Sequence, residues 1–191
     1  MNSAVATKIR HITSGIDVVP LLWALQANPG LWNQHTARTE NPASPHHEVD
    51  DIWVRYAPPE EADYEGPHEA VWYPTAEPIL PAVRAIVYPL MHLVQGDRLG
   101  GVLITRIRAG KSCKPHIDRG WHASTFRKFC VQIQSAPGQR FHVEEQSLEP
   151  RPGDLYEFRN EFEHWVENPT PHDRISMIAC IQTEIEFGMA S

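Results

Sequence analysis

The sequence predicts a mainly β protein: a double-stranded β-helix, the jelly-roll or cupin-like arrangement of two sheets, with α-helices flanking it on the N-terminal side. Two observations predict this fold class. Downstream of Gly100-Gly101, short β-like runs alternate with turn signals such as Pro137-Gly138, at spacings of about ten residues. Upstream, apolar residues recur at helical spacing. The runs expected to form strands are 102–108, 126–134, 140–145, 155–158, 164–167 and 174–185.

Two helices are expected before these strands. Asp17 can cap a helix whose apolar residues lie within 18–25, and the Asn28-Pro29-Gly30 run ends it. A second stretch, 79–94, repeats apolar residues every three or four positions. Pro89 lies inside this stretch and should kink the helix or split it.

The chain length of 191 residues suits one compact domain. Residues 33–70 are rich in Pro, Glu, His and Asp and are expected to be mostly loop, with one possible strand at 51–56. We therefore expect a single domain over 1–191. It would consist of a helical and irregular N-terminal layer (1–100) and a jelly-roll core (101–187).

Composition narrows the class of protein. A hydrophobic fraction of 41% with six Trp can build a core, and a charged fraction of 21% argues against wholesale disorder. The net charge of −7 argues against a general basic surface, so nucleic acid is not an expected partner. No apolar run is long enough to cross a membrane. Three cysteines without a CxxC pair, and an N-terminus without the apolar run of a secretory signal, predict a cytoplasmic protein.

Three segments carry a His and a carboxylate two positions apart: 46–48, 116–118 and 142–144. On an extended chain, residues i and i+2 point to the same side, so each pair can chelate a cation. A redox iron site of this kind needs two His and one carboxylate on one face of the metal, with open positions left for other ligands. The second His must come from a strand that is distant in sequence but adjacent in space.

The spacing selects one of the three pairs. From Asp118 to His164 is 164 − 118 = 46 residues, enough for three strand runs and a return to the neighbouring strand. From Glu144 to His164 is only 164 − 144 = 20 residues, and the first pair lies in a Pro-rich loop. We therefore predict that His116, Asp118 and His164 bind a metal ion. The alternative is that they are ordinary surface polar residues.

Arg174 and Ser176 share one side of the last predicted strand with Ile178. An Arg on an inward strand face is unfavourable unless it meets an anion. Its planar guanidinium binds a carboxylate through two parallel hydrogen bonds, and the Ser hydroxyl can add a third. The alternative for Arg174 is an internal salt bridge to Asp173 or Glu157.

At these residues the chain resembles the Fe(II)- and 2-oxoglutarate-dependent oxygenases, because the metal and anion-binding residues follow the order of that superfamily's signature. More narrowly, the stretch 101–181, under half of the chain, is similar to the aspartyl/asparaginyl β-hydroxylase-like group. The matching segments are 101–107 (GVLITRI), 115–122 (PHIDRGWH), 151–154 (RPGD) and 164–168 (HWVEN).

The resemblance implies that Fe(II) binds His116, Asp118 and His164 and is chelated by 2-oxoglutarate, whose far carboxylate is held by Arg174 and Ser176. Oxygen would be the second cosubstrate, and the reaction would hydroxylate an unactivated C–H bond with release of succinate and CO2. Some members of the group, and those that halogenate, lack the carboxylate. The presence of Asp118 therefore favours hydroxylation. The implied substrate is a peptide or protein side chain of the Asp or Asn type, or a small metabolite.

Arg127 is a second candidate for cosubstrate binding, since it shares a strand face with Phe129, Val131 and Ile133. It either contacts the cosubstrate or pairs with a structural acid, and the sequence favours neither. Several aromatic residues can line the pocket, although core packing is their more usual role. They are Trp121, Tyr156, Phe158 and Trp165, with His122 close to the metal pair.

Two other functions fit the predicted fold. A metal-dependent cupin enzyme that needs no 2-oxoglutarate would share the metal site but would have no use for an inward Arg174. A non-catalytic jelly-roll module that binds a ligand would show no metal dependence.

Overall fold

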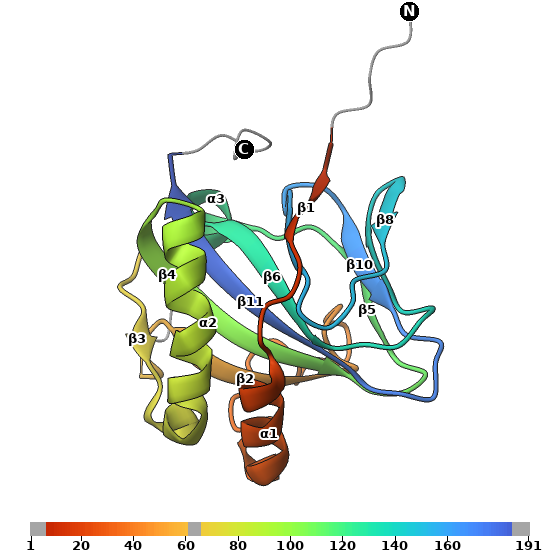
Figure 1. Ribbon diagram of the computed structural model, residues 1–191. Coiled ribbons are helices and arrows are strands. Elements are labelled where there is room, and N and C mark those ends of the chain that lie inside the picture. The colour runs from red at the N-terminus through yellow and green to blue at the C-terminus, as the bar shows by residue number, and fades with distance from the viewer. Residues whose placement is uncertain (1–6, 61–65, 185–191) are drawn as a thin grey trace, which may run out of the picture.

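The computed structural model describes residues 7–60 and 66–184, which form two antiparallel sheets, with the two longer helices against one face of the larger sheet (Figure 1). The predicted fold class, a mainly β jelly roll, is confirmed. In spatial order the large sheet contains β1 (Ile9–Thr13), β9 (Leu155–Phe158), β6 (Arg127–Gln134), β11 (Arg174–Thr183), β4 (Gly96–Ile107), β2 (Val49–Tyr56) and β3 (Val71–Trp72). The small sheet contains β5 (Ser112–His116), β10 (His164–Glu167), β7 (Arg140–Val143) and β8 (Gln146–Leu148).

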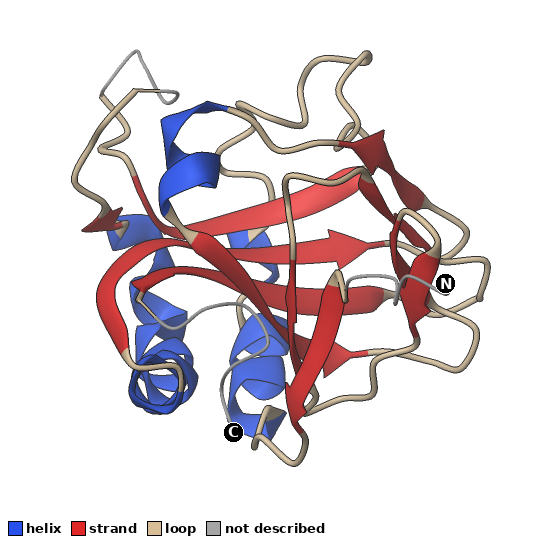
Figure 2. Ribbon diagram, turned by 90° about the horizontal axis from the view of Figure 1, so that it is seen from above, coloured by secondary structure: helices blue, strands red, loops and turns tan. Residues whose placement is uncertain are grey.

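The large sheet is buried on both faces. On one face, its apolar residues pack against helices α1 (Val19–Ala27) and α2 (Leu80–Leu93), which lie side by side in Figure 1. On the other face, a second apolar cluster joins the large sheet to the small one, with Phe141 and Val143 of β7 facing Tyr156 and Phe158 of β9. Figure 2 shows the strands and helices from above. The second cluster lies between the sheets, and it is there that the candidate site is found.

Both predicted helices are present. The N-cap of α1 is Val18, one residue after the predicted Asp17, although the Asp17 carboxylate accepts a hydrogen bond from the Val19 N–H (3.2 Å). Pro89 does not split α2, which runs unbroken from Leu80 to Leu93. A short helix that we did not expect, α3 (Gly120–Thr125), follows the predicted metal pair, and two 3-10 turns cover Pro29–Leu31 and Pro74–Ile79.

The strand predictions differ in quality along the chain. β9 and β10 have the predicted bounds, whereas β4 begins at Gly96, before the predicted start. Four short strands (β1, β3, β5 and β8) were not predicted. The division at residue 101 does not coincide with a structural boundary, because β1, β2 and β3 all join the large sheet. The predicted end of the core, 185–187, lies outside the described residues.

Among the residues that the structure describes, no helix combines the length and the apolar character that a membrane crossing requires.

Gly153 holds the turn before β9 against the segment that leads into α1. It has φ of +86°, and its carbonyl accepts a hydrogen bond from the Ile16 N–H (3.1 Å). A Cβ at this position would lie 2.8 Å from the Ile16 carbonyl oxygen. A side chain is therefore excluded both by the backbone conformation and by the neighbouring backbone.

We predict that Gly153→Ala lowers the free energy of unfolding by about 2 to 4 kcal/mol, because the left-handed strain and the close contact add. Gly110 is the matched control, since its φ is +71° but a Cβ there would meet no atom within 4 Å. Gly110→Ala should lose only about 1 to 2 kcal/mol. Urea unfolding of both variants measures the difference, and equal losses would contradict the steric argument.

Candidate metal centre

The small sheet brings the two predicted metal-binding histidines together. β10 pairs antiparallel with β5, and His164 lies directly opposite His116. Asp118 follows β5, and its backbone N–H donates a hydrogen bond to the Asn160 carbonyl (3.2 Å). The potential ligand atoms of His116, Asp118 and His164 all lie within 4.8 Å of one another. The structure therefore contains a candidate metal site made of the three residues that the spacing selects.

Backbone carbonyls orient both imidazoles of this group. The Nδ1 atoms of His116 and His164 are 2.8 Å from the Lys114 carbonyl and 2.9 Å from the Phe162 carbonyl, respectively. A carbonyl oxygen can only accept, so each Nδ1 carries the ring proton and each Nε2 has a free lone pair. Both Nε2 atoms lie 3.7 Å from an Asp118 oxygen. Two neutral imidazoles and one carboxylate, held in this way, fit a divalent transition metal.

The electrostatics of the group favour the protonation states that metal binding needs. Burial lowers the pKa of His164 to about 4 and also lowers the pKa of His116. Burial opposes ionisation of Asp118, but the nearby Lys128 ammonium and the two imidazoles outweigh it and hold the Asp118 pKa well below its usual range. The imidazoles therefore stay neutral and the carboxylate stays charged near neutral pH.

Arg174 is buried beside this group without a carboxylate partner. Its side chain is 2% exposed, and Nη2 donates a hydrogen bond to the Tyr156 hydroxyl (3.0 Å). Its Nε has no hydrogen-bond partner, and no ion pair forms between Arg174 and any acid in the described part of the chain. The alternative of a salt bridge to Asp173 or Glu157 is not what the structure shows. Glu157 pairs with two other arginines, and Asp173 accepts a backbone N–H instead.

One cavity of about 70 Å³ connects these residues. We call it the Arg174 pocket. Its lining includes the metal group, Arg174 and Ser176, and the Ser176 hydroxyl donates to the Gln132 side-chain oxygen (3.2 Å). Apolar and aromatic side chains make up much of the remaining wall. Among the aromatic candidates, those that line it are Tyr156, Phe158 and Trp165.

Arg127 lies on the face of β6 that points away from the Arg174 pocket. Its Nε donates to the Glu157 carboxylate (2.5 Å), and Arg127 does not line the Arg174 pocket. Of the two alternatives that the sequence left open, the structure shows the ion pair with an acid. Phe129 and Val131, which share its face, belong to the core against the helices.

The residue that the sequence did not reveal is Lys128, next to Arg127 on the strand. Its ammonium lies 3.2 Å from an Asp118 oxygen, with the side chain 17% exposed. Burial opposes the charge on Lys128, but Asp118 outweighs it and raises the Lys128 pKa above its usual value. β6 is buried on both faces, so alternation along it could not tell which side chains face the site.

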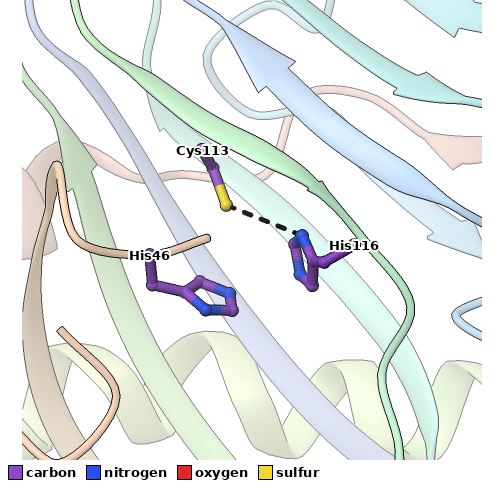
Figure 3. A group of neighbouring side chains, drawn as sticks. All are labelled: His46, Cys113 and His116. Carbon is purple, nitrogen blue, oxygen red and sulfur yellow. Dashed lines mark hydrogen bonds between the residues drawn. The ribbon is translucent and has the colours of Figure 1, made fainter. Parts of the chain in front are cut away.

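His46 also reaches the site, although the sequence places it in a Pro-rich loop. Figure 3 shows His46, Cys113 and His116 as neighbouring side chains, with the Cys113 thiol and the His46 ring on the same side of the His116 ring. These three residues form a second candidate metal group. Burial raises the pKa of the Cys113 thiol to about 12, and the His116 Nδ1 already donates to a backbone carbonyl. A protonated thiol is a poor ligand. The group with Asp118 is therefore the better metal site.

The fold and the site together define a jelly roll with a His-Asp-His group in a cavity lined by residues of both sheets. No protein-family model and no curated protein sequence matches the chain. Solved structures do match, at low identity. A Pseudomonas putida prolyl-4-hydroxylase is 14% identical, with a TM-score of 0.55 over 92% of each chain.

Two further solved structures have the same arrangement. A Trichoplax adhaerens prolyl hydroxylase in complex with a hypoxia-inducible factor peptide fragment is 10% identical (TM-score 0.54, 93% of this chain and 84% of that chain). An oxidoreductase of the 2OG-Fe(II) oxygenase family from Burkholderia pseudomallei is 17% identical (TM-score 0.50, 83% and 77%). At these identities the likeness establishes the fold. It does not single out the aspartyl/asparaginyl β-hydroxylase-like group.

His122, in α3 next to the metal group, is a neutral hydrogen-bonding residue. Its Nε2 accepts the Gly101 N–H (3.1 Å), and burial, followed by the positive charge of Lys128, lowers its pKa to about 3. Between pH 6.5 and about 3 the unfolded chain therefore takes up a proton at this residue that the folded chain does not. The free energy of unfolding must fall as the pH falls through this window.

We predict that His122→Gln makes the free energy of unfolding of the metal-free protein less dependent on pH. The Gln oxygen can still accept the Gly101 N–H but does not titrate. The slope of unfolding free energy against pH should fall by up to about 1.4 kcal/mol per pH unit. Urea unfolding at several pH values between 5 and 6.5 measures it. His172→Gln, at an exposed position, is the control. An unchanged slope in His122→Gln would show that His122 is not held neutral.

Proposed function

We propose that the protein is an Fe(II)- and 2-oxoglutarate-dependent dioxygenase that hydroxylates an unactivated C–H bond, formed by one oxygenase domain over 1–191. The observation that carries this proposal is the combination in the Arg174 pocket of a His-Asp-His group with a buried Arg that has no acid partner. A metal site alone fits many enzymes. The unpaired guanidinium adds the need for an anion that binds next to the metal.

One set of residues in the Arg174 pocket would bind the metal, and another set would bind the cosubstrate. His116, Asp118 and His164 would hold Fe(II), and 2-oxoglutarate and O2 would be the cosubstrates that react there. Bound iron supplies the oxidative chemistry, in which 2-oxoglutarate is converted to succinate and CO2 as the substrate is hydroxylated. Arg174 and Ser176 hold the far carboxylate of 2-oxoglutarate, and Tyr156 fixes the guanidinium. The apolar wall limits the access of water.

The substrate we propose is a side chain of the Asp or Asn type, in a peptide or protein, or a small metabolite with a similar group. The similarity of 101–181 to the aspartyl/asparaginyl β-hydroxylase-like group supports it. One structural neighbour binds a peptide fragment, which supports a peptide as one possible form. Three free, buried cysteines support a reducing compartment, the cytoplasm.

One prediction of the proposed function concerns the metal and cosubstrate together. Anaerobic addition of Fe(II) and 2-oxoglutarate should produce the weak visible absorption band of the iron chelate, and exposure to air should then yield succinate without added substrate. His116→Ala should lose both, because it removes one of three ligands. Iron binding without the band would favour a cupin enzyme that needs no 2-oxoglutarate. No metal binding would favour a ligand-binding module.

Another prediction of the proposed function concerns the role of Arg174 in binding 2-oxoglutarate. Arg174→Gln should raise the 2-oxoglutarate concentration needed for half of the absorption band by roughly 10- to 100-fold, since hydrogen bonds to a charged group contribute about 1.5 to 3 kcal/mol. Iron binding should be unaffected. Arg127→Gln is the control, because Arg127 is paired with Glu157 and lies outside the pocket. A requirement that is unchanged in Arg174→Gln, or raised equally in Arg127→Gln, would remove Arg174 from this role.

A further inference from the structure

A second and larger cavity, of about 540 Å³, adjoins the metal group. We call it the His122 pocket. It shares Asp118 and Lys128 with the Arg174 pocket, so the two cavities meet at the metal-binding carboxylate. The residues of its wall that matter for recognition are Trp53, Tyr56, Asp118, Arg119, His122 and Lys128. A molecule bound there lies next to the metal position without occupying the cosubstrate's place.

The charges along this cavity are predominantly positive. Asp118 is the one carboxylate among its described lining residues, and it lies beside Lys128. Arg38 also lines the cavity, but it is neutralised by two hydrogen bonds to the buried Asp51 carboxylate (2.6 and 2.7 Å). Arg119 is exposed, and no acid in the described segments lies within ion-pair distance of it.

Binding of the metal and cosubstrate would increase the excess of positive charge along the His122 pocket. The two charges of Fe(II) are balanced by Asp118 and by the carboxylate at the keto acid end of 2-oxoglutarate. The far carboxylate of 2-oxoglutarate is balanced by Arg174. Lys128 and Arg119 then remain as two positive charges without a partner. Lys128 is also largely shielded from water, so its attraction for an anion is weakly screened.

The uncharged part of the wall suits a carbon skeleton. Trp53, Tyr56 and His122 form a continuous aromatic wall, with ring centroids 5.0 Å apart for the first pair and 4.8 Å for the second. The His122 Nε2 accepts the Gly101 N–H, so the proton of the neutral ring is on Nδ1, which remains available as a donor. The cavity therefore combines positive charge and an N–H donor with flat apolar surface.

We propose that the His122 pocket binds the substrate, and that the substrate is an anion whose carboxylate is held by Lys128 and Arg119 while its carbon skeleton packs against Trp53 and Tyr56. This inference rests on the proposed function, and it narrows the substrate class to carboxylates, excluding carboxamides. Lys128 and Arg119 are then the residues that determine specificity. The carboxylate of a small acid and that of an acidic peptide side chain present the same chemistry to them.

The test compares matched acids and amides on protein saturated with Zn(II) and 2-oxoglutarate, so that the Arg174 pocket is filled and no turnover occurs. The probes are phenylacetate with phenylacetamide, and acetylated aspartate methylamide with its asparagine counterpart. Calorimetry gives their affinities. In each pair we expect the acid to bind at least about 10-fold more tightly, and less tightly as salt is added. Preference in the second pair alone would identify a peptide-like substrate.

Three variants decide which residues are responsible. Arg119→Gln and Lys128→Met should each weaken binding of the acid by about fivefold or more and leave the amide unchanged. Arg151→Gln removes an equal charge from an exposed position outside both pockets and should change neither. Equal affinity for acid and amide, no binding of any probe, or a preference that survives both pocket variants would overturn the proposal.

The iron chelate band, recorded in parallel with Fe(II), separates this inference from the proposed function. A normal band with no preference for acids would overturn the inference alone. An absent band with a clear, variant-sensitive preference for acids would overturn the proposed function and leave the charge selectivity of the pocket supported.

Discussion

The site depends on the register between β10 and β5, which sets His164 opposite His116. Facing residues of neighbouring antiparallel strands have their Cα atoms only about 4.5 to 5.5 Å apart, close enough for two imidazoles to share one metal ion. A shift by one residue would turn one ring to the other face of the small sheet. The register is held by the apolar cluster between the sheets, in which Val166 of β10 and Cys113 of β5 take part.

The same core explains why one arginine is available for an anion and another is not. Arg127 and Arg174 lie on adjacent strands, β6 and β11. Arg127 reaches Glu157, which is 1% exposed and is also paired with Arg10, so the Arg127 guanidinium has an acid partner inside the protein. Arg174 points between the sheets and reaches a neutral hydroxyl, that of Tyr156. A buried guanidinium without an acid is unfavourable until an anion binds. This uncompensated charge distinguishes the Arg174 pocket from a core salt bridge.

Strands and site residues that follow a local sequence pattern or spacing could be predicted from the sequence. β9 and β10 stand between clear turn signals and have the predicted bounds, and the 46-residue interval from Asp118 to His164 reflects the return to a neighbouring strand. β5 was missed because its sequence, SCKPH, has no apolar alternation and contains a Pro. It is held by pairing with β10 and by one buried thiol, which are tertiary effects.

Lys128 and His46 could not have been found in this way for related reasons. The position of Lys128 depends on which face of a doubly buried strand looks into the site, and a period of two cannot decide that. His46 is carried by a loop whose path is set by contacts such as that between the Ser44 hydroxyl and the Arg38 carbonyl. Such contacts join residues that no periodicity relates. The sequence therefore indicates the candidate metal ligands better than the residues that line the cavities around them.

Lys128 links the two cavities electrostatically. In the metal-free protein its charge is satisfied by Asp118, 3.2 Å away, and the His122 pocket then has little to offer an anion beyond the exposed Arg119. A divalent metal bound as we propose would take over the Asp118 carboxylate and withdraw that compensation. The attraction of the His122 pocket for an anion would therefore be strongest after the metal has bound. The far carboxylate of 2-oxoglutarate would not cancel it, because Arg174 would balance that charge. Since Asp118 lines both cavities, metal binding as proposed would both complete the metal site and free the Lys128 charge for a substrate anion.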